Sequence, residues 1–303
     1  MTPRHVPWAP PDGRFIDMPT GACFYREAGV GLPPIVLWHG LPVDARVYGR
    51  LQPLLSRRYR TLAPDFFGWG FSRPNEGLRY GFTTLDRNVA QFMEALALRA
   101  SVVVAHEMAG PPVLRWAATH ADQLRGLILL NTYFGRSSAH MPEALRLLNA
   151  PYIGASIRRM VDFGRSGLSW QLYRWQVGRL WVHRQPDSER ILRTFHAMFR
   201  HSREGRRAFH AISDELVEQI GANQRQLEVL AAVRCPTLLL WGADDPYLNT
   251  AAARHLHRLL PGSELRLLPR AGHFPQLEAP EAVATAVEEF VDRTAGARPD
   301  PRA

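Results

Sequence analysis

Short apolar runs alternate along this chain with segments of helical spacing, and this alternation restricts the possible folds more than any other feature. A short apolar run bounded by turn residues is typical of a strand buried on both faces, as in a parallel sheet. Helices are expected over Thr84–Leu98 and Ala279–Phe290. The sequence therefore predicts an α/β fold, with a mainly parallel twisted sheet flanked by helices. The expected strands are Arg14–Met18, Cys23–Glu27, Pro34–Trp38, Tyr59–Ala63, Ser101–Ala105, Gly126–Leu130, Pro236–Trp241 and Glu264–Leu268.

The strand pattern stops after Asn131 and resumes only at Cys235. The intervening segment is rich in Arg and Trp and has helical spacing. We interpret residues 134–222 as a helical cap inserted over the strand ends. Residues 1–133 and 223–303 then form the core domain.

The composition is that of a globular protein with a sizeable core, since 46% of the residues are hydrophobic and 21% are charged. No window of about 18 unbroken apolar residues occurs, so no membrane span is expected. The N-terminus lacks the apolar stretch of a secretory signal. Cys23 and Cys235 are expected to be small buried residues without a disulfide, which fits a reducing, cytoplasmic location.

The net charge is +9, and every basic residue is an arginine. No run of arginines with interleaved aromatic residues appears, so a nucleic-acid partner is not expected. The Arg-rich insertion leaves open an anionic substrate or an acidic carrier.

Residues 102–117, with the sequence VVVAHEMAGPPVLRWA, are typical of a buried strand, a sharp turn and a helix. Small residues at Ala105, Ala109 and Gly110 allow the strand and the helix to pass close to each other. The stretch resembles the nucleophile elbow of α/β-hydrolases, which implies that the turn projects Glu107 at a helix N-terminus, where the backbone dipole favours negative charge. Glu107 is thus the first candidate for a catalytic group.

Two further groups follow in chain order, Asp245 just past the strand Pro236–Trp241 and His273 after the last strand. The turn and this order resemble the α/β-hydrolase superfamily, in its epoxide hydrolase and haloalkane dehalogenase branch. The resemblance implies that Glu107 stands at the nucleophile position and that His273 is the general base. Asp245, rather than its neighbour Asp244, would orient the histidine.

Other motifs extend the resemblance to roughly residues 14–133 and 234–292. His39-Gly40-Leu41-Pro42 matches the HGxP loop of epoxide hydrolases and haloalkane dehalogenases, and residues 65–74 match their D-x-x-G-x-G-x-S loop. By this resemblance, the backbone N–H groups of Leu41 and Met108 would form an oxyanion hole.

The sequence departs from the family where the chemistry takes place. Glu107 replaces the Ser, Cys or Asp of relatives, and its extra methylene moves the carboxylate by about 1.5 Å. A displacement on that scale can cost on the order of a hundredfold in rate. Met108 and Leu41 replace the Trp and Asn that hold halide, which disfavours dehalogenation. No G-x-S-x-G occurs, which disfavours a serine hydrolase.

Three functions remain open from the sequence. The first is a cofactor-independent hydrolase resembling epoxide hydrolases, with Glu107 as a covalent nucleophile or a base. The second is a non-covalent acid/base lyase, cyclase or isomerase on the same fold. The third is a catalytically inactive, ligand-binding member. No metal or cofactor is implied by any of them.

The expected partner is a small, largely apolar substrate held between core and cap, with no membrane partner and with monomer or homodimer left open. Candidate substrate-binding residues are His39, His106, Tyr152, Tyr173 and Trp175. Epoxide hydrolases protonate the epoxide oxygen with cap tyrosines, so the resemblance makes Tyr152 and Tyr173 candidate acids. Tyr133, after the strand Gly126–Leu130, is a further candidate at the pocket edge.

Overall fold

The computed structural model describes residues 13–136 and 167–294, whose strands form one sheet. The strand order is β1-β2-β4-β3-β6-β7-β8-β9, and β5 pairs with β2. Strand β2 is antiparallel to β1, β4 and β5, whereas every neighbouring pair from β4 to β9 is parallel. The strands are β1 (Gly13–Met18), β2 (Gly21–Ala28), β3 (Ile35–Trp38), β4 (Thr61–Pro64), β5 (Arg73–Pro74), β6 (Ser101–Glu107), β7 (Leu124–Thr132), β8 (Thr237–Gly242) and β9 (Glu264–Leu268).

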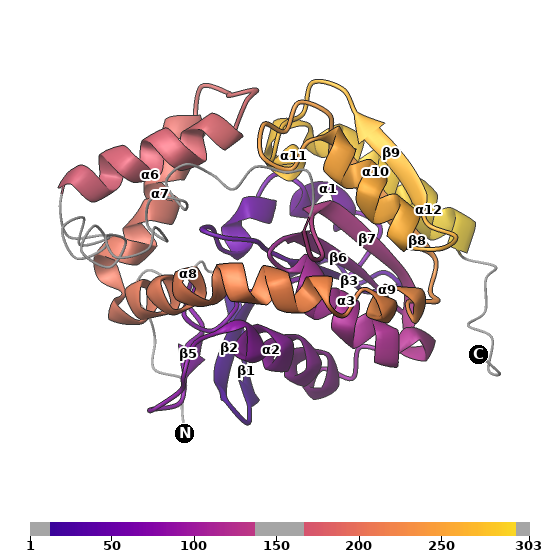
Figure 1. Ribbon diagram of the computed structural model, residues 1–303, viewed down its shortest axis with the longest axis horizontal. Coiled ribbons are helices and arrows are strands. Elements are labelled where there is room, and N and C mark those ends of the chain that lie inside the picture. The colour runs from indigo at the N-terminus through magenta and orange to yellow at the C-terminus, as the bar shows by residue number, and fades with distance from the viewer. Residues whose placement is uncertain (1–12, 137–166, 295–303) are drawn as a thin grey trace.

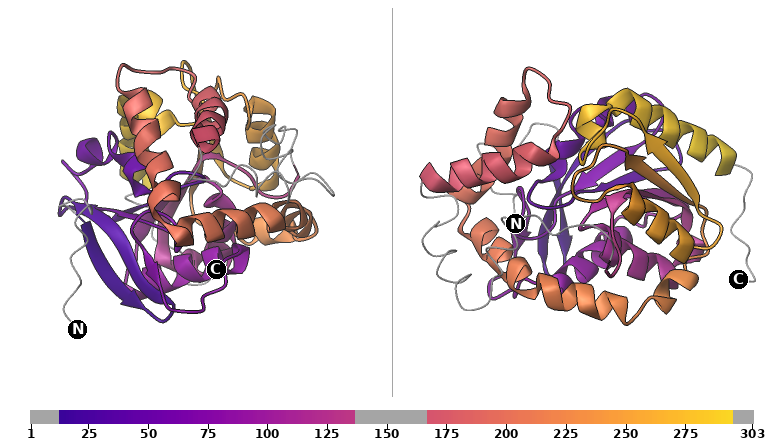
Figure 2. Two further views of the ribbon diagram at one scale, coloured as in Figure 1. Left: turned by 90° about the vertical axis from the view of Figure 1, so that its left-hand side faces the viewer. Right: turned by 45° about the horizontal axis from the view of Figure 1, so that its top comes forward.

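Helices cover the sheet, with α2 contacting α3 and α1 contacting α12. In Figure 2 the sheet lies between α12 and the α2–α3 pair. The predicted α/β fold with a mainly parallel sheet is confirmed. The α-helices of the described residues are α1 (Gln52–Leu55), α2 (Phe82–Ala95), α3 (Gly110–Thr119), α6 (Gly167–Leu180), α7 (Ser188–His201), α8 (Arg203–Gln224), α9 (Glu228–Ala231), α10 (Thr250–Leu259), α11 (Pro275–Glu278) and α12 (Pro280–Arg293).

Central strands are apolar because they are covered on both faces. Every residue of β3, β6 and β8 is buried. Each expected strand occurs within a few residues of its predicted bounds. Strand β5 was not expected, since two residues are too short to show a pattern.

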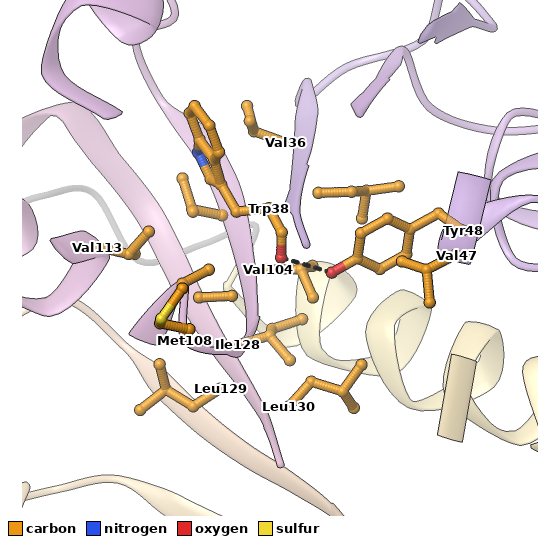
Figure 3. Close-up of a cluster of buried hydrophobic side chains, with 14 of the residues drawn as sticks. Val36, Trp38, Val47, Tyr48, Val104, Met108, Val113, Ile128, Leu129 and Leu130 are labelled. Atoms are coloured by element: carbon orange, nitrogen blue, oxygen red, sulfur yellow. Dashed lines mark hydrogen bonds between the residues drawn. The ribbon is translucent and has the colours of Figure 1, made fainter. Parts of the chain in front are cut away.

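The hydrophobic core continues beneath the strand ends that carry the site (Figure 3). Trp38, Tyr48, Val104, Met108 and Leu130 are all buried there. The Tyr48 hydroxyl donates a hydrogen bond to the Trp38 carbonyl at 2.7 Å, so its polar end is satisfied inside the core. Each large apolar side chain buried in this way contributes about 1.5–3 kcal/mol.

A helical insertion lies between β7 and β8, and its described part comprises α6, α7 and α8. Figure 1 shows α6 and α7 on one side of the molecule, away from α10 and α12, while α8 crosses in front of the sheet. Helix α8 ends at Gln224, close to the predicted end of the cap at residue 222. The exact domain boundaries stay a prediction.

No helix in residues 13–136 and 167–294 is both long enough and apolar enough to span a membrane. Cys23 and Cys235 are buried free thiols, and burial raises the pKa of both.

Candidate active site

Glu107 is the last residue of β6 and adopts a left-handed backbone conformation, with φ at 51°. A non-glycine residue pays about 1–2 kcal/mol for that conformation, so neighbouring contacts must hold it. The Thr132 hydroxyl, from the end of β7, donates a hydrogen bond to the Glu107 carbonyl. A Cβ at Gly110 would lie 1.9 Å from that hydroxyl oxygen. The turn therefore needs both the threonine and the glycine.

The Glu107 carboxyl group is held at one of its two oxygens. Oε2 accepts hydrogen bonds from the backbone N–H groups of Leu41, at 2.8 Å, and Met108, at 2.6 Å. These are the two N–H groups that the sequence assigns to an oxyanion hole. No hydrogen bond to Glu107 Oε1 occurs within residues 13–136 and 167–294. One oxygen is thus anchored, and the other is available to a ligand.

Gly40 makes room for the longer side chain. A Cβ at position 40 would lie 2.5 Å from Glu107 Cβ, 2.7 Å from Glu107 Oε2 and 3.1 Å from His106 Nδ1. Real Cβ atoms essentially never come within 3.0 Å of another side chain, so the two contacts with Glu107 could not be accommodated without a shift. The glutamate carboxyl reaches the two N–H groups because the neighbouring loop residue has no side chain.

We expect Gly40→Ala to displace the Glu107 carboxyl from the Leu41 and Met108 N–H groups. Overpacking of this kind costs about 1–3 kcal/mol in the free energy of unfolding. A misplaced reactive group lowers the rate by on the order of a hundredfold. Chemical denaturation and steady-state kinetics measure the two effects. Gly221→Ala is the matched control, because a Cβ there has only one contact, at 3.5 Å. Equal activity in both variants would contradict the role of Gly40.

His273 and Asp245 form a buried pair. His273 Nδ1 and Asp245 Oδ2 are 2.8 Å apart, and the same oxygen accepts a hydrogen bond from Asn131 Nδ2 at 2.7 Å. Asp245 Oδ1 accepts from the backbone N–H groups of Tyr247 and Leu248. Asp245 thus accepts hydrogen bonds from one side-chain and two backbone donors. It has no proton to give, so His273 Nδ1 carries the hydrogen of the bond between the two residues. His273 Nε2 is then the basic nitrogen, and it is buried without a hydrogen-bond partner in the described part of the chain.

The pKa values of the site reflect burial and mutual charge. Burial raises the pKa of Glu107, against the opposing effects of His273 and of the Leu41 and Met108 N–H groups. Burial alone would lower the pKa of His273, but the charge and hydrogen bond of Asp245, with the charges of Glu107 and Glu278, outweigh it and raise that pKa. Buried carboxyl and imidazole groups that shift each other's pKa are typical of a catalytic centre.

The backbone of His273 is tied to the cap. Its N–H donates to the carbonyl of Leu180, the last residue of α6, at 3.2 Å. Glu278 accepts from the N–H groups of His183, at 2.8 Å, and Phe274, at 3.0 Å. The end of the first described cap helix and the histidine loop therefore share hydrogen bonds.

The two histidine candidates for substrate binding are completely buried. His39 Nδ1 lies 2.7 Å from the Gly40 carbonyl, and its Nε2 accepts from the Phe66 N–H at 3.2 Å. His106 Nε2 lies 2.8 Å from the His273 carbonyl. Both rings hold loops of the site in place.

The cap candidates are placed differently from one another. The Tyr173 hydroxyl donates to the Pro42 carbonyl at 2.9 Å. Trp175 is 43% exposed, with the Arg179 guanidinium 5.1 Å above its ring. Tyr152 lies outside the described residues. The structure therefore brings Tyr173 beside the loop that carries Leu41 and leaves Trp175 at the surface.

Two other residues near the site were not singled out from the sequence. Asn131 links the loop that carries Asp245 to β8. Its Nδ2 donates to Asp245 Oδ2, and its Oδ1 accepts from the Gly242 N–H at 2.8 Å. The ring of Tyr247 lies 5.6 Å from the ring of His273. The position of Asn131 at a strand end was a usable signal, whereas Tyr247 sits in an acid-loop stretch whose sequence shows no pattern.

Residues 33–280 match a family described as the alpha/beta hydrolase fold. The chain belongs to the α/β-hydrolase family. Haloalkane dehalogenase 2 of Mycobacterium tuberculosis is 29% identical over 291 residues, covering 92% of this chain and 95% of the relative. The sequence expectation of this superfamily is therefore confirmed, and the homology to haloalkane dehalogenases is distant.

Solved structures with a similar architecture agree on the fold. A putative lipase from Acinetobacter baumannii has a TM-score of 0.79 at 19% identity and covers 93% of this chain and 91% of its own. A meta-cleavage product hydrolase from Pseudomonas fluorescens has a TM-score of 0.76 at 19% identity, covering 93% of this chain and 98% of its own. At such identities the likeness establishes the architecture, including the helical insertion.

Proposed function

We propose that this α/β-hydrolase is a cofactor-independent hydrolase that opens epoxides through an ester on Glu107. His273 would activate the water that hydrolyses the ester, and Asp245 would orient His273. One observation carries the proposal, namely that the Leu41 and Met108 N–H groups converge on Glu107 Oε2. When Oε1 attacks a carbon, Oε2 becomes the carbonyl oxygen of the ester, already placed between two donors.

The second step uses the same geometry. Water loses a proton to His273 Nε2 and attacks the ester carbonyl carbon, so negative charge develops on Oε2. Two N–H groups aimed at that oxygen stabilise the charge by about 3–4 kcal/mol per donor. The extra methylene of glutamate, which endangered this step in the sequence analysis, is compatible with it because Gly40 leaves space.

The choice of epoxide over haloalkane rests on the side chains around the site. A departing halide needs N–H donors from side chains, and neither Leu41 nor Met108 has one. This choice differs from the name of the relative from Mycobacterium tuberculosis, which is called a haloalkane dehalogenase. An oxygen leaving group instead needs a proton, which suits a site with tyrosines near Glu107.

We expect His273→Gln to accumulate an ester on Glu107 when the protein is incubated with styrene oxide. Without the base, the first step proceeds and the hydrolytic step stops. Intact-protein mass spectrometry followed by peptide mapping measures the adduct. His201→Gln, an exposed histidine at the end of α7, is the control and should show no adduct. Absence of an adduct from the His273 variant, with styrene oxide still consumed by the unaltered protein, would contradict covalent catalysis.

A non-covalent role for Glu107 is the second candidate, because burial raises the pKa of its carboxyl and so favours the protonated acid. The pH dependence separates the two. In the covalent route Glu107 must be ionised and His273 must be neutral, so kcat rises with pH. Because the pKa of His273 is raised above the ordinary 6.5, we expect the midpoint of that rise above pH 6.5. A general acid would give the opposite sign, with activity falling as pH rises.

A further inference from the structure

Epoxide opening leaves an oxygen that must receive a proton, and Tyr133 carries a buried hydroxyl that could supply it. Tyr133 is 5% exposed, and its hydroxyl oxygen has no hydrogen-bond partner among residues 13–136 and 167–294. A buried hydroxyl without a partner costs about 1–3 kcal/mol relative to a satisfied one. Such a group at a candidate catalytic site calls for a ligand that completes it.

The strand register places the residue before Tyr133 opposite Glu107. Thr132 is the partner of Glu107 across β6 and β7, and its hydroxyl bonds to the Glu107 carbonyl. Tyr133 is the next residue. The two side chains also interact electrostatically, since burial first, and then the charge of Glu107, raises the pKa of the Tyr133 hydroxyl. Tyr247 adds to the same effect. Tyr133 therefore stays protonated across the range in which Glu107 is ionised.

Tyr173, the cap tyrosine among the described residues, already uses its hydroxyl proton in a hydrogen bond. The hydroxyl of Tyr173 donates its single proton to the Pro42 carbonyl. Donation to a substrate would first require breaking that bond. The Tyr133 hydroxyl makes no such bond to any residue that the structure describes.

We propose that Tyr133, from the core sheet, is the acid that protonates the leaving oxygen, and that its hydroxyl marks the binding position of the substrate oxygen. This inference rests on the proposed function. In the first step Glu107 Oε1 bonds to an epoxide carbon, the ring C–O bond breaks, and the oxygen takes the Tyr133 proton. This step leaves a hydroxy ester and a phenolate.

The second step restores every group. Water gives one proton to His273 and adds its oxygen to the ester carbonyl carbon. The tetrahedral intermediate expels the alkoxide, which takes the proton back from His273. The new Glu107 carboxylic acid, the stronger acid of the two, returns its proton to the Tyr133 phenolate. The sum is one epoxide and one water converted to one diol.

The test measures ester formation on Glu107 in the His273→Gln background, with two probes of similar size. Styrene oxide leaves an alkoxide and needs an acid, whereas benzyl bromide is an activated halide whose bromide leaves without an acid and without the side-chain donors that an unactivated haloalkane needs. We expect Tyr133→Phe to slow the reaction with styrene oxide by about a hundredfold or more. The reaction with benzyl bromide should change less than about threefold. Glu107→Gln gives the background alkylation of each probe.

Tyr59→Phe is the matched control. Its hydroxyl is likewise buried without a partner in the described part of the chain, but the charges that act on it come from Arg58, Asp292, Glu288 and Arg125 rather than from Glu107. We expect no effect on the rate of ester formation from either probe.

An equal fall in the rate of ester formation from both probes in Tyr133→Phe would assign Tyr133 to packing and overturn the inference. An unchanged rate for both probes would also overturn it. An ester from neither probe with Tyr133 intact would contradict the covalent function itself. If Tyr247→Phe slows ester formation from styrene oxide and Tyr133→Phe does not, Tyr247 rather than Tyr133 is the acid.

Discussion

Glu107→Gln is expected to lower kcat by about 10⁴-fold or more while leaving the fold intact. An amide oxygen can still accept from the Leu41 and Met108 N–H groups, so the side chain keeps its position. The amide nitrogen, which would replace Oε1, cannot attack a carbon. Losing a residue that acts in the chemical step has an effect of this size. Epoxide turnover by the purified variant and its thermal melting temperature provide the measurements.

Ligand binding by Glu107→Gln distinguishes an enzyme from a catalytically inactive binding protein. An enzyme should retain binding of the diol product with turnover lost, because the shape of the site is preserved. Glu94→Gln, an exposed glutamate near the end of α2, is the control for loss of charge and should leave turnover unchanged. Unaltered turnover in Glu107→Gln would exclude any chemical role for the carboxyl.

Asp245→Asn is expected to reduce the hydrolytic step by about 10⁴-fold. Asp245 Oδ2 now accepts from both His273 Nδ1 and Asn131 Nδ2. An amide at that position places an NH₂ group against two donors, or turns it toward the Tyr247 and Leu248 N–H groups. The first orientation breaks the pairing that fixes the imidazole tautomer, and the second sets the NH₂ group against two backbone donors; both remove the negative charge beside the imidazole.

Single-turnover kinetics identify the affected step of Asp245→Asn. Ester formation on Glu107 should proceed, and ester hydrolysis should stall, so the adduct accumulates as in His273→Gln. Asp244→Asn is the adjacent control. Asp244 lies at the surface, 2.7 Å from His183 Nε2, and its removal should change kcat less than a few fold. Equal losses in both variants would contradict the assignment of Asp245.

The fold could be predicted because its central strands are continuous apolar segments. Val102–Ala105 and Leu238–Trp241 are unbroken apolar runs, and such runs have few alternatives to buried parallel strands. The turn at Glu107 was predictable for a similar reason, since strand, small residues and helix follow one another locally. Chain order then suggested His273 and Asp245.

The details of the site could not be predicted, because they depend on contacts between distant segments. Gly40 matters through its distance to Glu107, 67 residues further along the chain. Tyr173 and Trp175 share one helix, yet one hydroxyl meets the Pro42 carbonyl and the other ring faces solvent. Periodicity cannot distinguish them without the register of the helix against the core. Tyr247 is adjacent to the site only because the acid loop folds back over His273.

The bond between the Leu180 carbonyl and the His273 N–H couples α6 to the loop that carries His273. Helix α6 cannot swing outward without releasing that N–H, and the link from His183 to Glu278 strains in the same movement. Outward movement of α6 would therefore also act on the loop that carries the imidazole, so the position of the helical insertion and the alignment of His273 are mechanically linked.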